Sequence, residues 1–143
     1  MAIDMEKVVK DWFAAWNSRD VDKIIRFYAD DGIIESVYRE EVFKGKNGML
    51  EFVKADFVDY PDLKIEQKAT FYSANAVCGE VVFVGTHAHS SNPAVPATGK
   101  HFSIRGAYIS EWQNGKIKRH AIYMDSLTLM RQVGLMPGIP SKK

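Results

Sequence analysis

The carboxylate best placed for chemistry is Asp125, near the end of a predicted strand that spans residues 116–126. The preceding predicted strand spans residues 101–113, and Asn114-Gly115 between them favours a two-residue type I′ turn, because both residues tolerate positive φ. If neither strand contains a bulge, this turn fixes the register and places Asp125 opposite Ile104.

The face that Asp125 then shares is apolar and aromatic, with Ile104, Tyr108 and Tyr123 among its residues. A carboxylate on such a face is costly unless it is hydrogen-bonded or protonated. Burial would raise its pKa toward the range useful for proton transfer, and the two tyrosines could hydrogen-bond a developing enolate or simply pack in the core. Asp125 also precedes a short helix predicted to begin near Ser126. Capping that helix is an equally open role, compatible with catalysis.

His87 is the second candidate for catalysis, on a predicted strand that spans residues 76–89. His87 and His89 share a face of this strand with the apolar residue Phe83, so we expect them to point inward, toward the same pocket. His87 could donate a hydrogen bond to a substrate carbonyl or enolate, or it could be a structural histidine bonded to the Pro-rich loop 90–100. The two histidines could approach one metal ion, but no third ligand is placed with them, so we expect no metal.

Three N-terminal helices and a later sheet must position these residues. Apolar residues at a helical period predict helices over about 3–17, 20–28 and 47–57. A short strand is expected over residues 33–37, and period-two patterns predict strands over 63–72, 76–89, 101–113 and 116–126. Trp16 and Tyr28 lie on apolar helix faces, where they line the pocket or pack in the core. The order of elements predicts an α+β domain with helices packed on one face of a mostly antiparallel sheet.

The composition excludes several classes of protein. The 143 residues fit a single domain over 1–143 whose C-terminal tail is 134–143, and 19 Lys and Arg against 18 Asp and Glu give no reason to expect nucleic acid or an anionic membrane. One cysteine and no basic or apolar leader at the N-terminus favour a cytoplasmic protein. Three apolar residues, Ile109, Ile122 and Met124, alternate to the outer sheet face in the predicted register and suggest a homodimer through that face.

Several motifs carry a resemblance to a known family. The opening WFAAWNSRDVDKIIRFYADDGIIES resembles the two-helix start of the nuclear transport factor 2-like, or ketosteroid isomerase-like, superfamily. The second half resembles its SnoaL-like polyketide cyclase branch, through Gly85-Thr86-His87, Pro96-Ala97-Thr98-Gly99, Asn114-Gly115-Lys116-Ile117, Asp125, and the Leu129 to Gly134 segment. In one departure, the family commonly has Trp where this chain has Ala121, on the pocket face of the predicted register.

The resemblance implies a cone-shaped barrel, in which a strongly curved sheet and helices enclose an apolar pocket. It also implies a cyclase or isomerase that needs no cofactor, in which Asp125 is the acid/base group and the substrate is an apolar carbonyl compound such as a polyketide. Predicted pocket residues are Trp16, Tyr28, Phe83, Ile104, Tyr108 and Tyr123. The same scaffold also carries non-catalytic binding or dimerisation modules, epoxide hydrolases and dehydratases, which remain alternatives. An epoxide hydrolase would use an arginine beside the aspartate to activate water, and the candidate Arg105 lies on the opposite face from Asp125 in the predicted register.

Overall fold

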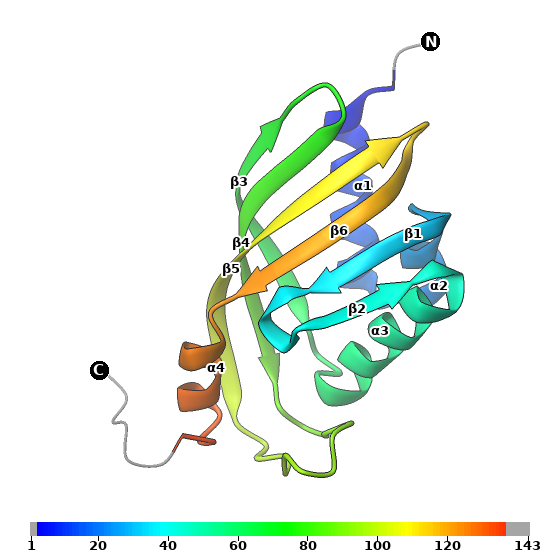
Figure 1. Ribbon diagram of the computed structural model, residues 1–143. Coiled ribbons are helices and arrows are strands. Elements are labelled where there is room, and N and C mark those ends of the chain that lie inside the picture. The colour runs from blue at the N-terminus through cyan, green and yellow to red at the C-terminus, as the bar shows by residue number, and fades with distance from the viewer. Residues whose placement is uncertain (1–2, 137–143) are drawn as a thin grey trace.

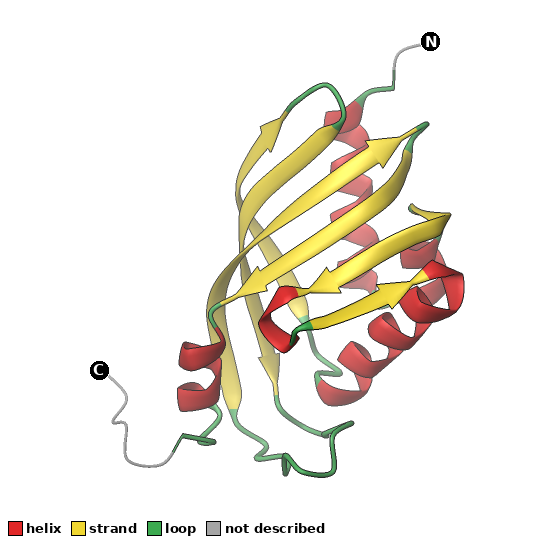
Figure 2. Ribbon diagram, in the orientation of Figure 1, coloured by secondary structure: helices red, strands yellow, loops and turns green. Residues whose placement is uncertain are grey.

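Six strands form one curved mixed sheet, and helices pack against it (Figure 1; Figure 2). The computed structural model describes residues 3–136, so the end of the predicted tail, 137–143, lies outside the described residues. The helices are α1 (Met5–Ser18), α2 (Val21–Ile25), α3 (Gly45–Asp59) and α4 (Ser126–Gln132), with a short 3₁₀ helix η1 (Val37–Arg39). The strands are β1 (Tyr28–Ser36), β2 (Glu41–Lys44), β3 (Lys64–Tyr72), β4 (Ala76–Thr86), β5 (His101–Gln113) and β6 (Lys116–Met124).

The strand order is β2-β1-β6-β5-β4-β3, and every neighbouring pair is antiparallel except β1 and β6. The predicted α+β architecture, with three N-terminal helices on a strongly curved sheet, is confirmed. The sheet is not a closed barrel, because β2 and β3 remain as its edges. The sequence pattern also missed β2, and it placed Tyr28 in a helix, whereas α2 ends at Ile25 and Tyr28 begins β1.

The helix α1 supplies much of the aromatic core. Asp4 caps its N-terminus by accepting a hydrogen bond from the Lys7 N–H at 3.2 Å, and its buried face carries Trp12 and Trp16. Asn17 in the last turn bonds both backbone groups of Ile65, accepting from its N–H at 2.8 Å and donating to its carbonyl at 2.9 Å. These two bonds hold α1 against the edge strand β3.

The β5–β6 hairpin begins at the predicted turn, where Asn114 and Gly115 both have positive φ, 53° and 74°. The predicted pair Trp112–Ile117 is present, but the next pair is Glu111 with Arg119, so Lys118 is the extra residue of a β-bulge. The backbone of β1 lies close to the bulge, because a Cβ on Gly32 would stand 2.9 Å from the Ile117 carbonyl oxygen.

The bulge shifts the pairing of the rest of β6 by one residue, so the predicted register is wrong beyond the bulge. Tyr108 pairs with Ile122 instead of Ala121, and Gly106 pairs with Met124 instead of Tyr123. A shift of one residue exchanges the two faces of a strand. The inward residues of β6 are therefore His120, Ile122 and Met124, whereas Tyr123 and Asp125 are exposed and Ala121 lies on the outer side between Ile109 and Glu35.

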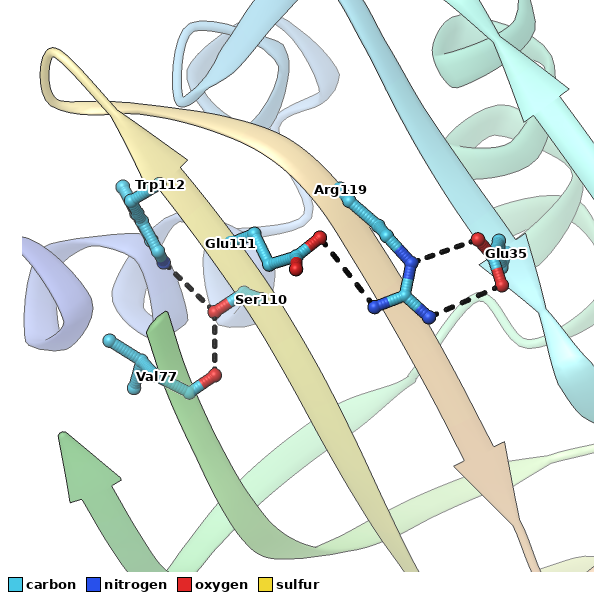
Figure 3. Close-up of polar contacts among 6 residues, drawn as sticks. All are labelled: Glu35, Val77, Ser110, Glu111, Trp112 and Arg119. Carbon is cyan, nitrogen blue, oxygen red and sulfur yellow. Dashed lines mark hydrogen bonds and ion pairs between the residues drawn. The ribbon is translucent and has the colours of Figure 1, made fainter. Parts of the chain in front are cut away.

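Figure 3 shows the two sides of the sheet next to the bulge. On one side the Trp112 indole N–H donates to Ser110 Oγ at 2.8 Å, and that hydroxyl donates to the Val77 carbonyl at 2.9 Å. On the other side Arg119 lies between Glu35, at 2.9 Å, and Glu111, at 3.7 Å. Arg119 therefore occupies the place opposite Glu111 that an unbulged strand would give to Lys118.

Within residues 3–136, no helix is long and apolar enough to cross a membrane. In the same part of the chain, no three His, Cys, Asp or Glu side chains cluster in a way that could hold a metal ion.

Candidate functional site

An apolar cavity lies between the sheet and the helices. Its walls come from α1, η1, α3, α4 and the inner face of the sheet, and they are formed by Trp12, Phe13, Trp16, Tyr38, Phe52, Asp56, Tyr60, Leu63, Ile65, Val81, Phe83, Phe102, Tyr108, His120, Ile122, Met124 and Leu129. The empty space out to the mouth is about 650 Å³, but the centre of a water molecule can reach only about 40 Å³ of it. One water molecule needs roughly 10–15 Å³ of such space, so the cavity as it stands has room for only a few water molecules or a small ligand.

Three of the predicted substrate-binding residues, Trp16, Phe83 and Tyr108, line this cavity. Ile104 is buried in the core and is not among the lining residues, and Tyr28 contacts the cavity-lining His120 from behind. Tyr123 is 40% exposed on the outer face, so its predicted place in the pocket is wrong. The bulge at Lys118 is the physical reason, because it reverses the faces of every later residue in β6.

Asp125 is outside the cavity as well, and its predicted placement on the apolar face is wrong for the same reason. It is the N-cap of α4, where its carboxylate accepts from the Thr128 N–H at 3.1 Å and from the Thr128 hydroxyl at 2.7 Å. These hydrogen bonds hold the pKa of the exposed Asp125 carboxyl below its ordinary value. The structure thus gives Asp125 the surroundings of a helix cap and not those of a base in an apolar pocket.

His87 is buried just after the end of β4, beside the cavity but not among the residues that line it. Its ring stacks at an angle on the cavity-lining Tyr60, with 5.9 Å between the ring centroids. Within residues 3–136 its Nδ1 atom has no hydrogen-bond partner. The catalytic role predicted for His87 remains a prediction.

The Pro-rich loop is attached to the C-terminal end of α3 through Asp59. The carboxylate of Asp59 accepts hydrogen bonds from the Ser91 N–H at 2.6 Å and from the Ser91 hydroxyl at 2.9 Å.

Arg105, which an epoxide hydrolase mechanism would need beside the pocket aspartate, lies on the outer face. Its side chain is 74% exposed and pairs with Glu80 at 2.8 Å. The Arg105 version of that alternative therefore has no support in the geometry.

The carboxylate that does face the cavity is Asp56, near the C-terminal end of α3. It accepts a hydrogen bond from the Arg39 guanidinium at 3.1 Å, and its side chain is 11% exposed. Burial raises the pKa of Asp56 to about 6, although the positive charge of Arg39 acts in the opposite direction. Arg39 itself stands over the rings of Tyr38 and Phe52, at 5.2 and 5.9 Å from their centroids.

The cavity wall also contains an imidazole, that of His120. It is 5% exposed, its ring lies 4.9 Å from that of Trp12, and its Nδ1 atom is 2.9 Å from the Tyr28 hydroxyl. Burial lowers the pKa of His120 to about 3, so the imidazole is neutral at ordinary pH. The cavity therefore combines one desolvated carboxylate with one neutral imidazole.

Sequence reasoning missed both groups. Asp56 carried a signal, because it continues the three- and four-residue spacing of the buried residues Met49, Phe52 and Val53 on α3. No comparable signal marked His120. The Asn114-Gly115 turn could not show which face of the sheet His120 occupies, because that face depends on the bulge at Lys118.

The family can now be stated, because a family model described as "SnoaL-like polyketide cyclase" matches residues 6–133. The chain belongs to this family. Among curated proteins, none matches the sequence significantly.

Several solved structures share the fold of this SnoaL-like protein. A SnoaL-like polyketide cyclase from Agrobacterium tumefaciens superposes with a TM-score of 0.76 at 21% identity, over 93% of this chain and 100% of that one. TsrD from Streptomyces laurentii gives 0.80 at 20% identity, over 94% and 100%. A protein with a ketosteroid isomerase-like fold from Catenulispora acidiphila, in complex with trimethylamine, gives 0.77 at 16% identity, over 94% and 97%. At these identities the likeness shows the fold alone.

Proposed function

We propose that this SnoaL-like protein is a cofactor-independent cyclase or isomerase that acts by acid/base catalysis on an apolar carbonyl compound bound in the cavity, with Asp56 as the base. The observation that carries the proposal is a desolvated carboxylate in the wall of an otherwise apolar cavity. A pKa near 6 leaves the group ionised at neutral pH and still basic enough to take a proton. Asp56 replaces Asp125 in this role because Asp125 lies outside the cavity.

The reaction would begin when Asp56 takes a proton from the carbon beside a carbonyl group. In a cyclase, the resulting enolate forms a carbon–carbon bond to a second carbonyl of the same molecule, and protonated Asp56 returns its proton to the new alkoxide. In an isomerase, the substrate has a C=C bond next to the deprotonated carbon, and protonated Asp56 returns the proton to the far carbon of the resulting dienolate, so that the double bond moves into conjugation with the carbonyl group. The apolar walls would hold the substrate in a folded conformation and keep water from the carboxylate.

The size of the cavity limits the ligand that it can hold. The small free volume favours a one-ring compound in the cavity as it stands, and a multi-ring polyketide would require the walls to move.

The test is exchange of the α-protons of cyclohexanone in D₂O, followed by NMR, because exchange needs only the first step and a one-ring ketone. We expect the protein to accelerate exchange and Asp56→Asn to reduce that acceleration by at least about 100-fold. Asp125→Asn is the matched control, since it removes an aspartate but keeps a good helix cap, and it should leave the rate unchanged. Full activity in Asp56→Asn, or its loss in Asp125→Asn, would reject Asp56 as the base.

We also propose that two copies associate through the outer sheet face. Ile122 and Met124, on which this expectation partly rested, face inward, but Phe71, Cys78 and Ile109 form a cross-strand row on the outside, next to Tyr123. Sedimentation equilibrium should show a dimer that Ile109→Asp disrupts, and a monomeric wild-type protein at high micromolar concentration would contradict this.

A further inference from the structure

The cavity-lining His120 forms a hydrogen-bonded pair with Tyr28 that the chemistry of Asp56 does not use. The Tyr28 hydroxyl lies 2.9 Å from His120 Nδ1, and both residues are about 5% exposed or less. His120 lines the cavity, whereas Tyr28 stands behind it at the start of β1. Because β1 and β6 are neighbouring parallel strands, the pair joins two adjacent strands of the sheet.

The surroundings decide which atom of this pair carries the shared proton. The hydroxyl of Tyr28 keeps its proton, because burial raises the pKa of Tyr28; the nearby indole N–H groups of Trp12 and Trp16 lower it only in part, and the negative charge of Asp56 raises it further. Those indole groups are donors and cannot accept the phenolic proton. The proton therefore points to His120 Nδ1, the acceptor within hydrogen-bond distance.

A neutral imidazole whose Nδ1 accepts a hydrogen bond carries its own proton on Nε2. The ring packs edge-on against Trp12 and Tyr108, with centroids 4.9 and 6.1 Å away, so its environment is aromatic. Within residues 3–136, Nε2 makes no hydrogen bond to another residue. An unpaired N–H donor is thus left in the wall of the cavity.

We propose that His120 donates a hydrogen bond from Nε2 to the carbonyl oxygen of the substrate and to the enolate that replaces it, and that Tyr28 is the positioning residue that fixes this tautomer. The inference rests on the proposed function and extends it, because it assigns the electrophile that Asp56 needs as a partner. A neutral donor suits an enolate, since it stabilises the developing charge without surrendering its proton to the product. Low basicity keeps the imidazole neutral while Asp56 is ionised.

The first experiment reads the tautomer without any substrate. Two-bond ¹H–¹⁵N spectra of the imidazoles should show His120 with its proton on Nε2, unchanged from pH 8 to pH 5. Tyr28→Phe should remove the restraint and give a mixture of tautomers or a ring that titrates in that range. A proton on Nδ1 in the wild-type protein would overturn the proposal, because Nδ1 faces Tyr28 and not the cavity.

The second experiment uses cyclohexanone labelled with ¹³C at the carbonyl, whose resonance moves downfield when the oxygen accepts a hydrogen bond. We expect the bound shift to disappear in His120→Asn, whose amide can replace Nδ1 but does not reach the position of Nε2, and to return in part in His120→Gln, whose longer amide does. His120→Asn should also lower the rate of α-proton exchange by about 10²–10³-fold, and His120→Gln should restore part of that rate. An unaltered shift and exchange rate in His120→Asn would overturn the role of His120.

These readouts separate the inference from the function on which it rests. If no variant and no wild-type protein exchanges α-protons, the proposed function fails, while the tautomer and the carbonyl shift still decide for or against His120 as a donor. If exchange requires Asp56 but is indifferent to His120, the function stands and the inference fails.

Discussion

At the scale of single residues, Asp56 and Asp125 have opposite environments. The buried Asp56 has a pKa raised to about 6, whereas hydrogen bonds from Thr128 lower the pKa of the exposed Asp125. The raised value means that ionising Asp56 is less favourable in the folded protein than in water, even beside Arg39. A group in this state is costly to keep, which fits a role beyond holding the fold together.

The raised pKa of Asp56 should make the stability of the protein depend on pH. Because the folded pKa of Asp56 exceeds its unfolded value of about 3.9, folding binds protons between about pH 4 and pH 6, and the contribution of Asp56 to stability is lost as the pH rises through about 6. Relative to Asp56→Asn, the wild-type free energy of unfolding should fall by up to about 3 kcal/mol between pH 4 and pH 7, in urea titrations.

Asp125→Asn provides the opposite sign as a control. Its lowered pKa means that Asp125 stabilises the fold above about pH 4 and loses that contribution as the pH falls further. If the wild-type protein and Asp56→Asn showed parallel pH profiles from pH 4 to pH 7, Asp56 would not have the raised pKa on which the account depends.

At the scale of elements, the bulge in β6 decides which residues face the cavity. It brings His120 inward and sends Asp125 outward, and it lies against β1 at Gly32. A Cβ at Gly32 would stand 2.9 Å from the Ile117 carbonyl oxygen and 3.1 Å from that of Ala29, and both are backbone atoms that cannot move aside cheaply. Glycine at this position therefore permits the close approach of β1 to the bulged strand.

Gly32→Ala should accordingly destabilise the protein by about 1–3 kcal/mol, because the methyl group would be forced against both carbonyls. Chemical denaturation measures this directly. Imidazole NMR would show in addition whether His120 loses its contact with Tyr28. A neutral or stabilising Gly32→Ala would mean that the close approach of β1 does not support the bulge.

The same element explains how far the sequence could predict the site. Hydrophobic periodicity predicted α1, α3 and the four long strands, and Asn114-Gly115 predicted the hairpin turn that is observed. The turn fixes only the first pairs of the hairpin, and nothing local in the sequence marks Lys118 as an extra residue. The bulge lies against Gly32 of β1, a residue far away in the chain, so the inward face of β6 required the tertiary structure.

At the scale of the whole molecule, the small cavity limits what can bind. Three elements, η1, α3 and α4, each contribute cavity-lining residues, among them Tyr38, Asp56 and Leu129. Leu129 of α4 is 8% exposed and lines the cavity, whereas Leu127 of the same helix is 56% exposed. The packing of α4 therefore limits the size of the cavity on this side.

Leu129→Ala should enlarge the cavity and shift its preference toward larger ketones. We expect α-proton exchange of the two-ring ketone 2-tetralone to rise relative to that of cyclohexanone, while stability falls by about 2–5 kcal/mol. Leu127→Ala is the same change two residues earlier. It should leave the ratio of the two exchange rates unchanged and alter the free energy of unfolding by no more than about 0.5 kcal/mol. Equal selectivity in the two variants would show that α4 does not limit the cavity.

If proton transfer takes place at Asp56 inside the cavity, the pH profile of α-proton exchange must follow the ionisation of Asp56. A base acts in its ionised form, so the rate of cyclohexanone exchange should rise with pH through about 6, reach a plateau near pH 7, and lose this dependence in Asp56→Asn but not in Asp125→Asn. A profile that is already flat above pH 4, or that is unchanged in Asp56→Asn, would contradict the claim.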